Sequence, residues 1–573
     1  MFTLFFHILN KERTLTMKSR QHSTIGITAL LLIQLFFNPN SRAGQPGQTD
    51  EGMPQLVRHG NVAQLYVDGK PFLIIGGELN NSTSSSLEYM KPIWQHVADL
   101  NFNTVLTPLS WELIEPKEGG FDFSLVDGLI KEARQDRMHL VFLWLASWKN
   151  GMSTYVPLWV KENYKKYPRA TIQKDSTVEI LSTFSEANVK ADSKAFAALM
   201  KHIRETDGVN HTVLMIQVEN EVGILGDSRD RSKVANAAFA APVPKELMEY
   251  LVKHKEELVP EMKELWSKNS FQTSGNWEKI FGKGENCNEA FMAWTYARYV
   301  NTVVNAGKKE YPIPMYANAW LDQDCCPTPG RFPSGGPLAH VFDVWLAGAP
   351  AVDIMAPDLY VPEFEERCQK FSQRGNPLFI PEMPGGDDGA RNVFLAVGSH
   401  NAIGVSPFGI DRLGTTASDA EQVKGPKETS LSKSYSILKQ ISPWILEKQA
   451  AGEIAGFVLD EKNPVRTYDL GGYRVEVSFD ELFGQRAKSG YGIIMTDGPD
   501  KFLGAGSGFR VRFFSKKRSE EIIGIGSVDE GVFHDDVWVP GRRLNGDETS
   551  AGAAWRFSTS KLNIEKCAVY TYE

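Results

Sequence analysis

The stretch MIQVENEVG, residues 215–223, begins as an apolar segment typical of a buried strand and ends in three polar side chains, Glu219, Asn220 and Glu221. A charged carboxylate is costly to bury, so an acid that closes a buried strand either reaches solvent or takes part in chemistry. On a strand Glu219 and Glu221 share one side, and a bulge at the strand end would let two successive residues point into the same space. The rest of the chain decides between a surface feature and a site.

Seven further apolar segments follow the same pattern, several of them ending in polar or aromatic residues, and the eight alternate with amphipathic helical patterns. The helical segments include SLEYMKPIWQHVADL at 86–100 and LVDGLIKEARQDR at 125–137, whose apolar residues recur every three to four positions. This alternation predicts an α/β fold, a (β/α)8 TIM barrel over residues 50–445 whose active face lies at the C-terminal ends of the strands. The candidate strands cover 71–80, 102–112, 139–148, 213–221, 313–320, 352–360, 377–383 and 402–410.

One connection in this barrel is far longer than a single helix requires. The fourth and fifth strands are separated by an insertion at about 223–312 that contains several aromatic rings. We expect most of them to form the core of the insertion itself, and the alternative is that they wall a cleft at the active face. The rings are those of Trp266, Phe271, Trp277, Phe281, Phe291 and Trp294.

Residues 446–573 show a different pattern, in which short segments of period-two alternation are separated by glycines. This pattern predicts a C-terminal all-β domain, a sandwich or small barrel, that packs on the first domain as an accessory. The sequence GAGSG at 504–508 superficially matches a phosphate loop, but it precedes a strand-like segment instead of a helix. We therefore expect a turn there.

The N-terminal residues 1–43 have the layout of a secretory signal peptide, with Lys18 and Arg20 before an apolar stretch at 25–37 and with Met17 as an alternative start. We expect a soluble periplasmic or secreted protein without a stable membrane anchor, and retention of the segment as an anchor is the alternative.

The net charge of −8 argues against a nucleic-acid partner. The five cysteines are odd in number and form no CxxC or Cys/His pattern, so neither a disulfide framework nor a zinc site is expected.

A second carboxylate closes another apolar strand. In PLFIPEMPGG, Glu382 lies three strands after Glu221, and a barrel would bring the two acids to the same mouth. Hydrolysis of a glycosidic bond uses such a pair, one acid to protonate the leaving oxygen and one carboxylate to attack or stabilise the anomeric carbon. The proton donor needs a pKa raised by burial or by a like charge, and a second acid about 5 Å away implies retention of configuration.

Three segments of the chain resemble glycoside hydrolase family 35, the β-galactosidases, within the clan of retaining barrel glycosidases. QVENEVG at 217–223 resembles the acid/base motif of that family, and WELIEPKEGGFDFS at 111–124 resembles its second-strand motif. GYGIIMTDGPDKFLGAGSGFRVRF at 490–513 is similar to the β-rich domain of a bacterial branch. The third strand departs from the family, with LASWKNG in place of a Cys-Ala-Glu-like segment, and so does IPEMPGG around Glu382. These departures affect the expected sugar specificity more than the mechanism.

The resemblance implies a role for several residues at strand ends. Glu221 becomes the acid/base and Glu382 the nucleophile, while Asn220 holds the sugar 2-hydroxyl. Tyr360 matches the place of a tyrosine beside the nucleophile, although an ordinary ring at the barrel rim explains it equally well. Glu219 is expected to be structural, in an ion pair below the sugar. Further candidates for substrate binding are Trp148, Lys149, Asn150, Trp320, Glu78 and Trp111.

Together these inferences predict an exo-acting β-galactosidase that works by double displacement on an oligosaccharide or polysaccharide and uses no metal or cofactor. The bacterial branch points to galactose-capped plant cell-wall fragments of the xyloglucan type. One alternative keeps the chemistry and changes the sugar to a β-arabinoside, β-glucoside or β-glucosaminide. Another is a carbohydrate-binding protein that has lost catalysis, which the presence of both acids disfavours. The sequence leaves the oligomeric state open.

Overall fold

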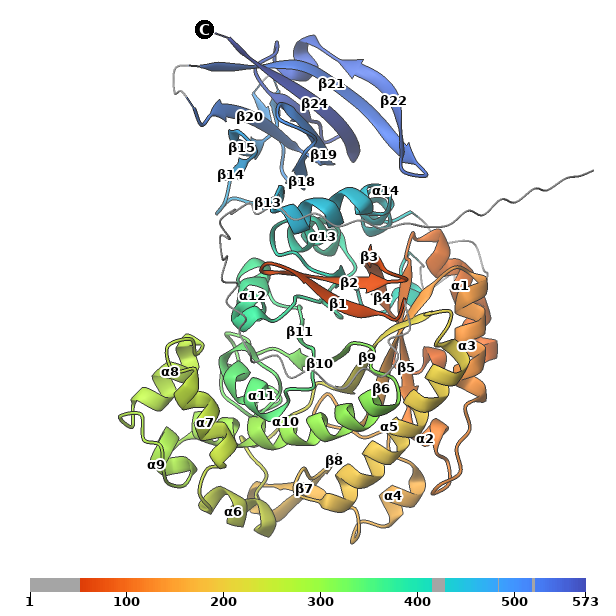
Figure 1. Cartoon of the computed structure of the whole chain (residues 1–573), viewed down its shortest axis with the longest axis vertical. Coiled ribbons are helices and arrows are strands. Elements are labelled where there is room, and N and C mark those ends of the chain that lie inside the picture. The colour runs from red at the N-terminus through yellow and green to blue at the C-terminus, as the bar shows by residue number, and fades with distance from the viewer. Residues whose placement is uncertain (1–51, 415–427, 483, 518–520, 573) are drawn as a thin grey trace, which may run out of the picture. The chain divides into compact units, whose positions relative to one another are not determined.

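Seven parallel strands form one sheet in the order β11-β10-β9-β6-β5-β4-β12 (Figure 1). Parallel bridges from Asp358 to Glu382 and from Ile380 to Val405 link both edges of this sheet to the segment 377–383, so eight parallel segments close a barrel as predicted. The computed structural model describes residues 52–414, 428–482, 484–517 and 521–572. The strands are β4 (Ile74–Glu78), β5 (Thr104–Ser110), β6 (His139–Lys149), β9 (Val213–Asn220), β10 (Met315–Trp320), β11 (Ile354–Asp358) and β12 (Gly404–Val405).

Strand β6 shows why the barrel strands are apolar without alternation. Val141 and Leu143 belong to one buried core, which also contains residues of an N-terminal antiparallel hairpin. Phe142 and Trp144, on the opposite face, belong to the core that includes the surrounding helices. Both faces are therefore buried, as in other parallel sheets covered by helices. The hairpin pairs β1 (Gln55–His59) with β2 (Val62–Val67), and β3 (Lys70–Phe72) adds a third strand to this sheet. The sequence analysis did not predict these strands.

Helices follow the barrel strands and surround them (Figure 1). The first begins after Ser86, whose hydroxyl accepts a hydrogen bond from the Tyr89 backbone N–H and so caps the helix. Thr429 and Ser432 form a capping box at the start of the last. The main barrel helices are α1 (Leu87–Asp99), α3 (Ser124–Gln135), α5 (Glu186–Asp207), α10 (Glu285–Glu310), α11 (Phe342–Gly348), α12 (Phe364–Phe371), α13 (Asp387–Ser399) and α14 (Ser430–Ala451).

The long connection after β9 folds into four short helices followed by α10. Helix α10 packs along α5 and leads into β10, so the last part of the predicted insertion is the regular barrel helix. Of the six aromatic side chains named from the sequence, five are buried in the core shared with the barrel helices and Phe271 is half-buried, so most of them are core residues as expected. The four short helices are α6 (Lys233–Ala240), α7 (Lys245–Lys253), α8 (Pro260–Ser267) and α9 (Trp277–Phe281).

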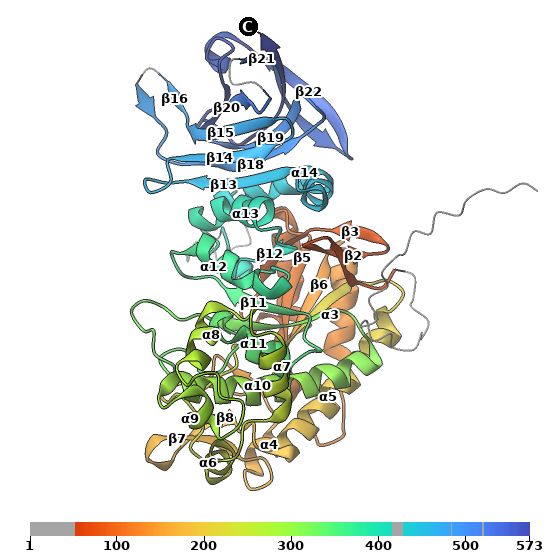
Figure 2. The ribbon, with the colours of Figure 1, turned by 60° about the vertical axis from the view of Figure 1, so that its left-hand side comes forward.

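The C-terminal region is a β-sandwich, as predicted. A six-stranded sheet, β13-β18-β19-β24-β21-β22, and a four-stranded sheet, β14-β15-β20-β23, enclose one apolar core (Figure 2). Its strands are β13 (Ile454–Leu459), β14 (Val465–Leu470), β15 (Tyr473–Phe479), β18 (Gly490–Thr496), β19 (Lys501–Ser507), β20 (Phe509–Ser515), β21 (Ile522–His534), β22 (Val537–Leu544), β23 (Trp555–Phe557) and β24 (Asn563–Tyr572), and a small two-stranded sheet is formed by β16 (Glu481–Leu482) and β17 (Gln485–Arg486).

The prediction of a turn over GAGSG was wrong for most of that segment. Its first four residues lie inside β19, and only Gly508 occupies the turn to β20. A side chain at Gly504 would meet the Trp555 ring at 2.5 Å, so the glycine is required by packing within the sandwich.

Strand β13 packs directly on helix α13 (Figure 2). A Cβ atom on Gly456 would lie 2.0 Å from the Phe394 carbonyl oxygen, which shows how closely the two backbones approach. The Ser399 hydroxyl donates to the Gly456 carbonyl oxygen at 2.6 Å and accepts from the Gly456 N–H at 3.1 Å. The sandwich is therefore held against the barrel by backbone contacts and not by a loose linker.

None of the helices among the described residues is long and apolar enough to cross a membrane. The predicted signal peptide lies outside the described residues. All five cysteines are free thiols.

Candidate active site

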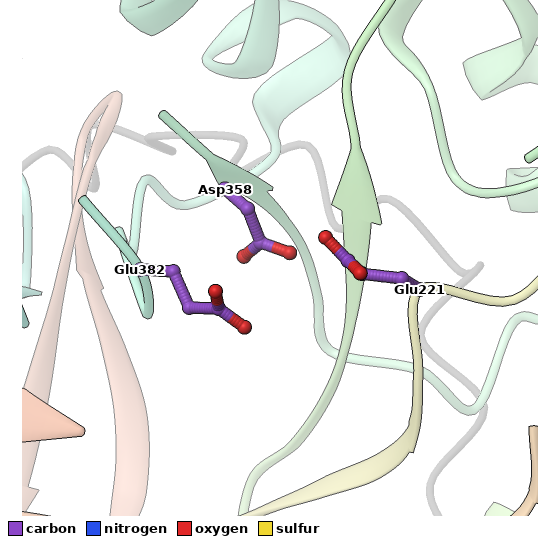
Figure 3. Close-up of side chains that lie close together, drawn as sticks. All are labelled: Glu221, Asp358 and Glu382. Carbon is purple, nitrogen blue, oxygen red and sulfur yellow. The ribbon is translucent and has the colours of Figure 1, made fainter. Parts of the chain in front are cut away.

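Three carboxylates meet at the C-terminal ends of the barrel strands. Glu221 follows β9, Asp358 ends β11, and Glu382 lies in the segment that closes the barrel. One carboxylate oxygen of each lies within 4.8 Å of one oxygen of each of the others. All three side chains are buried, and they point toward one another from separate segments of the chain (Figure 3).

A local change of backbone conformation brings Asn220 and Glu221 into this space together. Glu219 and Glu221 have φ angles of +64° and +44°, in the left-handed region that such residues seldom adopt. The pairing of β6 with β9 shifts register at the same place, so that Lys149 lies opposite Asn220. The predicted irregularity at this strand end is confirmed.

Hydrogen bonds fix the orientation of the three acids. The Asn318 side-chain oxygen accepts from the Glu221 backbone N–H at 2.9 Å, and its amide donates to Asp358 Oδ2 at 2.7 Å. The Asn150 amide donates to the Glu221 carboxylate. The Tyr360 hydroxyl donates to Glu382 Oε2 at 3.1 Å. Each acid is thus positioned by a side chain from a neighbouring strand or its C-terminal loop.

The pKa of Glu221 is raised to about 7, first by burial and then by the negative charge of Glu382, against the opposing effect of Lys149. Burial, with Glu382 and Glu221, also raises the pKa of Asp358 well above its usual value. Carboxyl groups this close cannot all be ionised at once, because each negative charge opposes the next. The site therefore holds at least one proton near neutral pH.

Lys149 and Glu78 complete the charged cluster. The Lys149 ammonium donates to Asn220 Oδ1 at 2.9 Å. Burial alone would lower its pKa, but Glu382 and Glu221 outweigh this and raise it, so Lys149 stays a cation. Glu78, at the end of β4, has a raised pKa because of burial and Glu382, and neither of its oxygens has a hydrogen-bond partner among the described residues.

Most of the predicted site residues come together here. Glu221, Glu382, Asn220, Asn150, Glu78 and Tyr360 surround the cluster, as does Lys149. The half-buried Trp320 ends β10 and lies opposite Asp358 in the pairing of β10 with β11.

Two predicted sugar contacts do not fit their positions. The Trp148 ring is fully buried against Tyr296 and Tyr299, and its indole N–H donates to the Leu181 carbonyl oxygen at 3.0 Å. Trp111 is also fully buried, with its indole N–H bonded to Glu115 at 2.9 Å. Neither indole offers a face to a sugar, so both are core residues.

Glu219 lies beneath the site, but not in the predicted ion pair. One of its oxygens accepts from the Trp148 backbone N–H at 2.9 Å, and the charged group that most affects it is another acid, Asp192. Burial and Asp192 raise the pKa of Glu219 well above its usual value. A structural role remains, with a neighbouring acid in place of the expected cation.

Asp358 and Asn318 were missed by the sequence analysis. Both lie near the end of an apolar barrel strand, in APDLY and ANAW, and this is the same signal that identified Glu221 and Glu382. The three acids are also spaced closely enough to hold a metal ion, although the adjacent Lys149 ammonium already supplies positive charge there.

Two parts of the chain match known family models. Residues 86–343 match the family model Glyco_hydro_42, described as β-galactosidase, and residues 431–556 match a domain of unknown function, DUF5597. A β-galactosidase from Xanthomonas manihotis is 27% identical over 186 residues, which cover 31% of this chain and 28% of that protein. The chain thus matches less than a third of that relative's length. The specific resemblance to family 35 is not confirmed, because the matching model represents another β-galactosidase family.

Among solved structures, the β-galactosidase from Bacillus circulans sp. alkalophilus is similar with a TM-score of 0.44 and 14% identity, over 65% of this chain and 57% of that one. A family 39 glycoside hydrolase from Bacteroides cellulosilyticus WH2 has a TM-score of 0.38 and 10% identity, over 89% of this chain and 84% of that one. The family match, unlike these distant likenesses, is specific to a stretch of the barrel. Residues 86–343 are therefore similar to a glycoside hydrolase domain of the β-galactosidase type.

Proposed function

We propose that the chain is a retaining, exo-acting β-galactosidase that removes terminal β-galactosyl residues from oligosaccharides. The observation that carries this proposal is the approach of Glu221 and Glu382 within 4.8 Å at the mouth of the barrel, with the pKa of Glu221 raised to about 7. This spacing leaves little room for the attacking water that an inverting enzyme places between its carboxyl groups, and so it favours retention.

In the first step, protonated Glu221 donates its proton to the glycosidic oxygen while a Glu382 oxygen forms a bond to the anomeric carbon. The bond from that carbon to the leaving oxygen breaks, and the leaving group departs as a neutral alcohol. In the second step, Glu221 takes a proton from water, whose oxygen bonds to the anomeric carbon and releases Glu382. Two inversions give net retention.

The surrounding residues support these roles. The Tyr360 hydroxyl holds one Glu382 oxygen at 3.1 Å, while the other oxygen has no hydrogen-bond partner among the described residues. Lys149 and Asn220 form a polar pair at 2.9 Å that suits a sugar hydroxyl, and the half-buried Trp320 suits the apolar face of a pyranose. Galactose is proposed from the family match over residues 86–343.

Two finer proposals rest on the sequence. The resemblance of QVENEVG and its companion motifs to family 35 favours galactose-capped plant fragments of the xyloglucan type as natural substrates. The charged, apolar and small residues of 18–43 favour export and a periplasmic or secreted location.

The test is a panel of aryl β-glycosides, with proton NMR following the first anomer released from the best substrate. We expect β-galactose to appear first and to mutarotate afterwards. First release of α-galactose would contradict the retaining pair, and release of arabinose, glucose or glucosamine in place of galactose would contradict the sugar. The absence of turnover on every member would contradict the enzyme itself.

A further inference from the structure

A cavity of about 540 Å³ opens beside Tyr360, whose hydroxyl bonds to Glu382. The barrel segments that follow β11 and Glu382 line one side of it. The turns after β13 and before β18 in the sandwich line the other. Its volume lies within the usual range of ligand pockets. The two chemical steps at Glu221 and Glu382 make no use of this space.

The two sides of the cavity are held in a fixed arrangement. The contact of β13 with α13 includes the close approach at Gly456 and its two hydrogen bonds to Ser399. The Arg391 guanidinium donates to the Ser489 hydroxyl at 3.1 Å directly at the cavity. Arg466 of the sandwich also pairs with Glu365 of the barrel at 2.6 Å. A ligand would therefore meet a preformed site, without the need to order two loose domains.

The lining residues combine apolar surfaces with free polar groups. Tyr360 is 46% exposed, and the rings of Pro362 and Pro384 are exposed beside it. Glu461 and Lys488, from the sandwich, face the same cavity and form no hydrogen bond or ion pair within the part of the chain that the structure describes. Sugars present the same combination, with apolar C–H faces and hydroxyl groups at the edges.

We propose that this cavity binds the leaving-group oligosaccharide, so that the sandwich takes part in substrate recognition. The inference rests on the proposed function, because in an exo-acting enzyme every sugar beyond the terminal one belongs to the leaving group. Tyr360 joins the two places, since its hydroxyl orients Glu382 and its exposed ring borders the cavity. The region that matches a domain of unknown function would thus determine which oligosaccharides are accepted.

The test compares a tetrasaccharide that ends in a β-galactosyl unit with an aryl β-galactoside. We expect the double variant Glu461→Ala/Lys488→Ala to lower the ratio of kcat/KM for the tetrasaccharide to kcat/KM for the aryl substrate by about tenfold, since two hydrogen bonds to sugar hydroxyls are lost. The matched control is Asp469→Ala/Lys516→Ala, which removes an exposed 3.4 Å ion pair elsewhere on the same domain. The control should leave the ratio unchanged.

A binding measurement separates this inference from the proposed function. The trisaccharide that lacks the galactosyl unit should bind the wild-type full chain in calorimetry and bind the double variant at least about fivefold more weakly. An unchanged substrate ratio together with unchanged trisaccharide binding would overturn the inference while leaving the galactosidase intact. Failure of the wild type to hydrolyse the aryl galactoside would instead overturn the proposed function, and the trisaccharide would still test the cavity because its binding needs no turnover.

Discussion

The molecule buries glutamates with raised pKa values in two regions, the mouth of the barrel and the sandwich. In the sandwich, Glu565 is 1% exposed and its pKa is raised to about 8, chiefly by burial. Its oxygens accept from the Trp555 indole at 2.7 Å and from the Asn563 amide at 3.5 Å. The neighbouring Glu530 is paired with Arg542 and Lys561. Both of these buried acids therefore have hydrogen-bond or ion-pair partners.

At the barrel mouth, in contrast, several carboxylate oxygens have no hydrogen-bond partner among the described residues. Among the described residues, both oxygens of Glu78 and one oxygen each of Asp358 and Glu382 have no hydrogen-bond partner. Burying such groups without partners costs free energy, which a fold tolerates where a substrate will supply the missing contacts. A raised pKa, or a single unpartnered oxygen as at Glu219, therefore does not separate a reaction site from a structural acid. The convergence of several unpartnered oxygens on one space does.

The strongest test of this comparison replaces single carboxyl groups in each region by the neutral amide. Glu221→Gln and Glu382→Gln should each lower kcat/KM for aryl β-galactosides by about 10²–10⁴-fold, because the proton donor or the attacking oxygen is lost. Glu565→Gln, an equally conservative change at an equally buried glutamate, should leave kcat/KM unchanged. Steady-state kinetics with circular dichroism on all three variants checks this. Residual activity close to wild type in either barrel variant would show that Glu221 and Glu382 are not the reacting pair.

The pH dependence of the wild type gives the next largest effect. Because Glu221 must donate a proton, kcat/KM should fall about tenfold per pH unit above about pH 7, where this carboxyl ionises. Measurement of kcat/KM between pH 5 and pH 9 tests this expectation. A plateau that continues unchanged to pH 9 would mean that another group supplies the proton.

Lys149 is a cation within the barrel cluster, and replacing it tests how that charge affects the pKa of Glu221. Its charge lowers the pKa of Glu221, so Lys149→Met should raise that pKa and move the alkaline limb of the profile upward by about one pH unit. Lys566→Met serves as the matched control, since Lys566 pairs with Asp497 at 3.2 Å in the sandwich. The control should leave the limb in place. If the alkaline limb of the profile stays at the same pH in Lys149→Met, the group that ionises there is not Glu221.

Much of the barrel mouth could be predicted from the sequence because its signal is local. An acid that closes an apolar run, as Glu221 and Glu382 do, is visible without any knowledge of the fold, and the eight runs locate the mouth. Asp358 also lies at the end of an apolar run, but the sequence analysis selected Tyr360, two residues later in that run, and missed Asp358. The family resemblance placed the chain among β-galactosidases, although the match lies with a different family model.

The remaining errors concern contacts between residues far apart in the chain. Trp148 and Trp320 both follow apolar strands, yet Trp148 is enclosed by Tyr296 and Tyr299 of α10 while Trp320 stays half-buried at the mouth. Gly504 lies in a strand because Trp555 packs against it from across the sandwich. Such packing partners are set by the tertiary fold and leave no periodic pattern in the sequence.

The smallest expected effect concerns stability alone and tests the sandwich side of the comparison. In the folded chain Glu565 keeps its proton up to about pH 8, whereas in the unfolded chain a glutamate loses it near pH 4.5. Its contribution to stability is therefore fully present below about pH 4.5 and is lost as the pH rises toward 8, by an amount on the order of a few kcal/mol. Glu565→Gln keeps an acceptor for the Trp555 indole without a charge to bury, so its Tm should decline less between pH 5 and pH 8 than that of the wild type. Parallel Tm curves would mean that Glu565 ionises freely where it lies, and the distinction between a satisfied structural acid and an unsatisfied reactive one would then rest on the barrel alone.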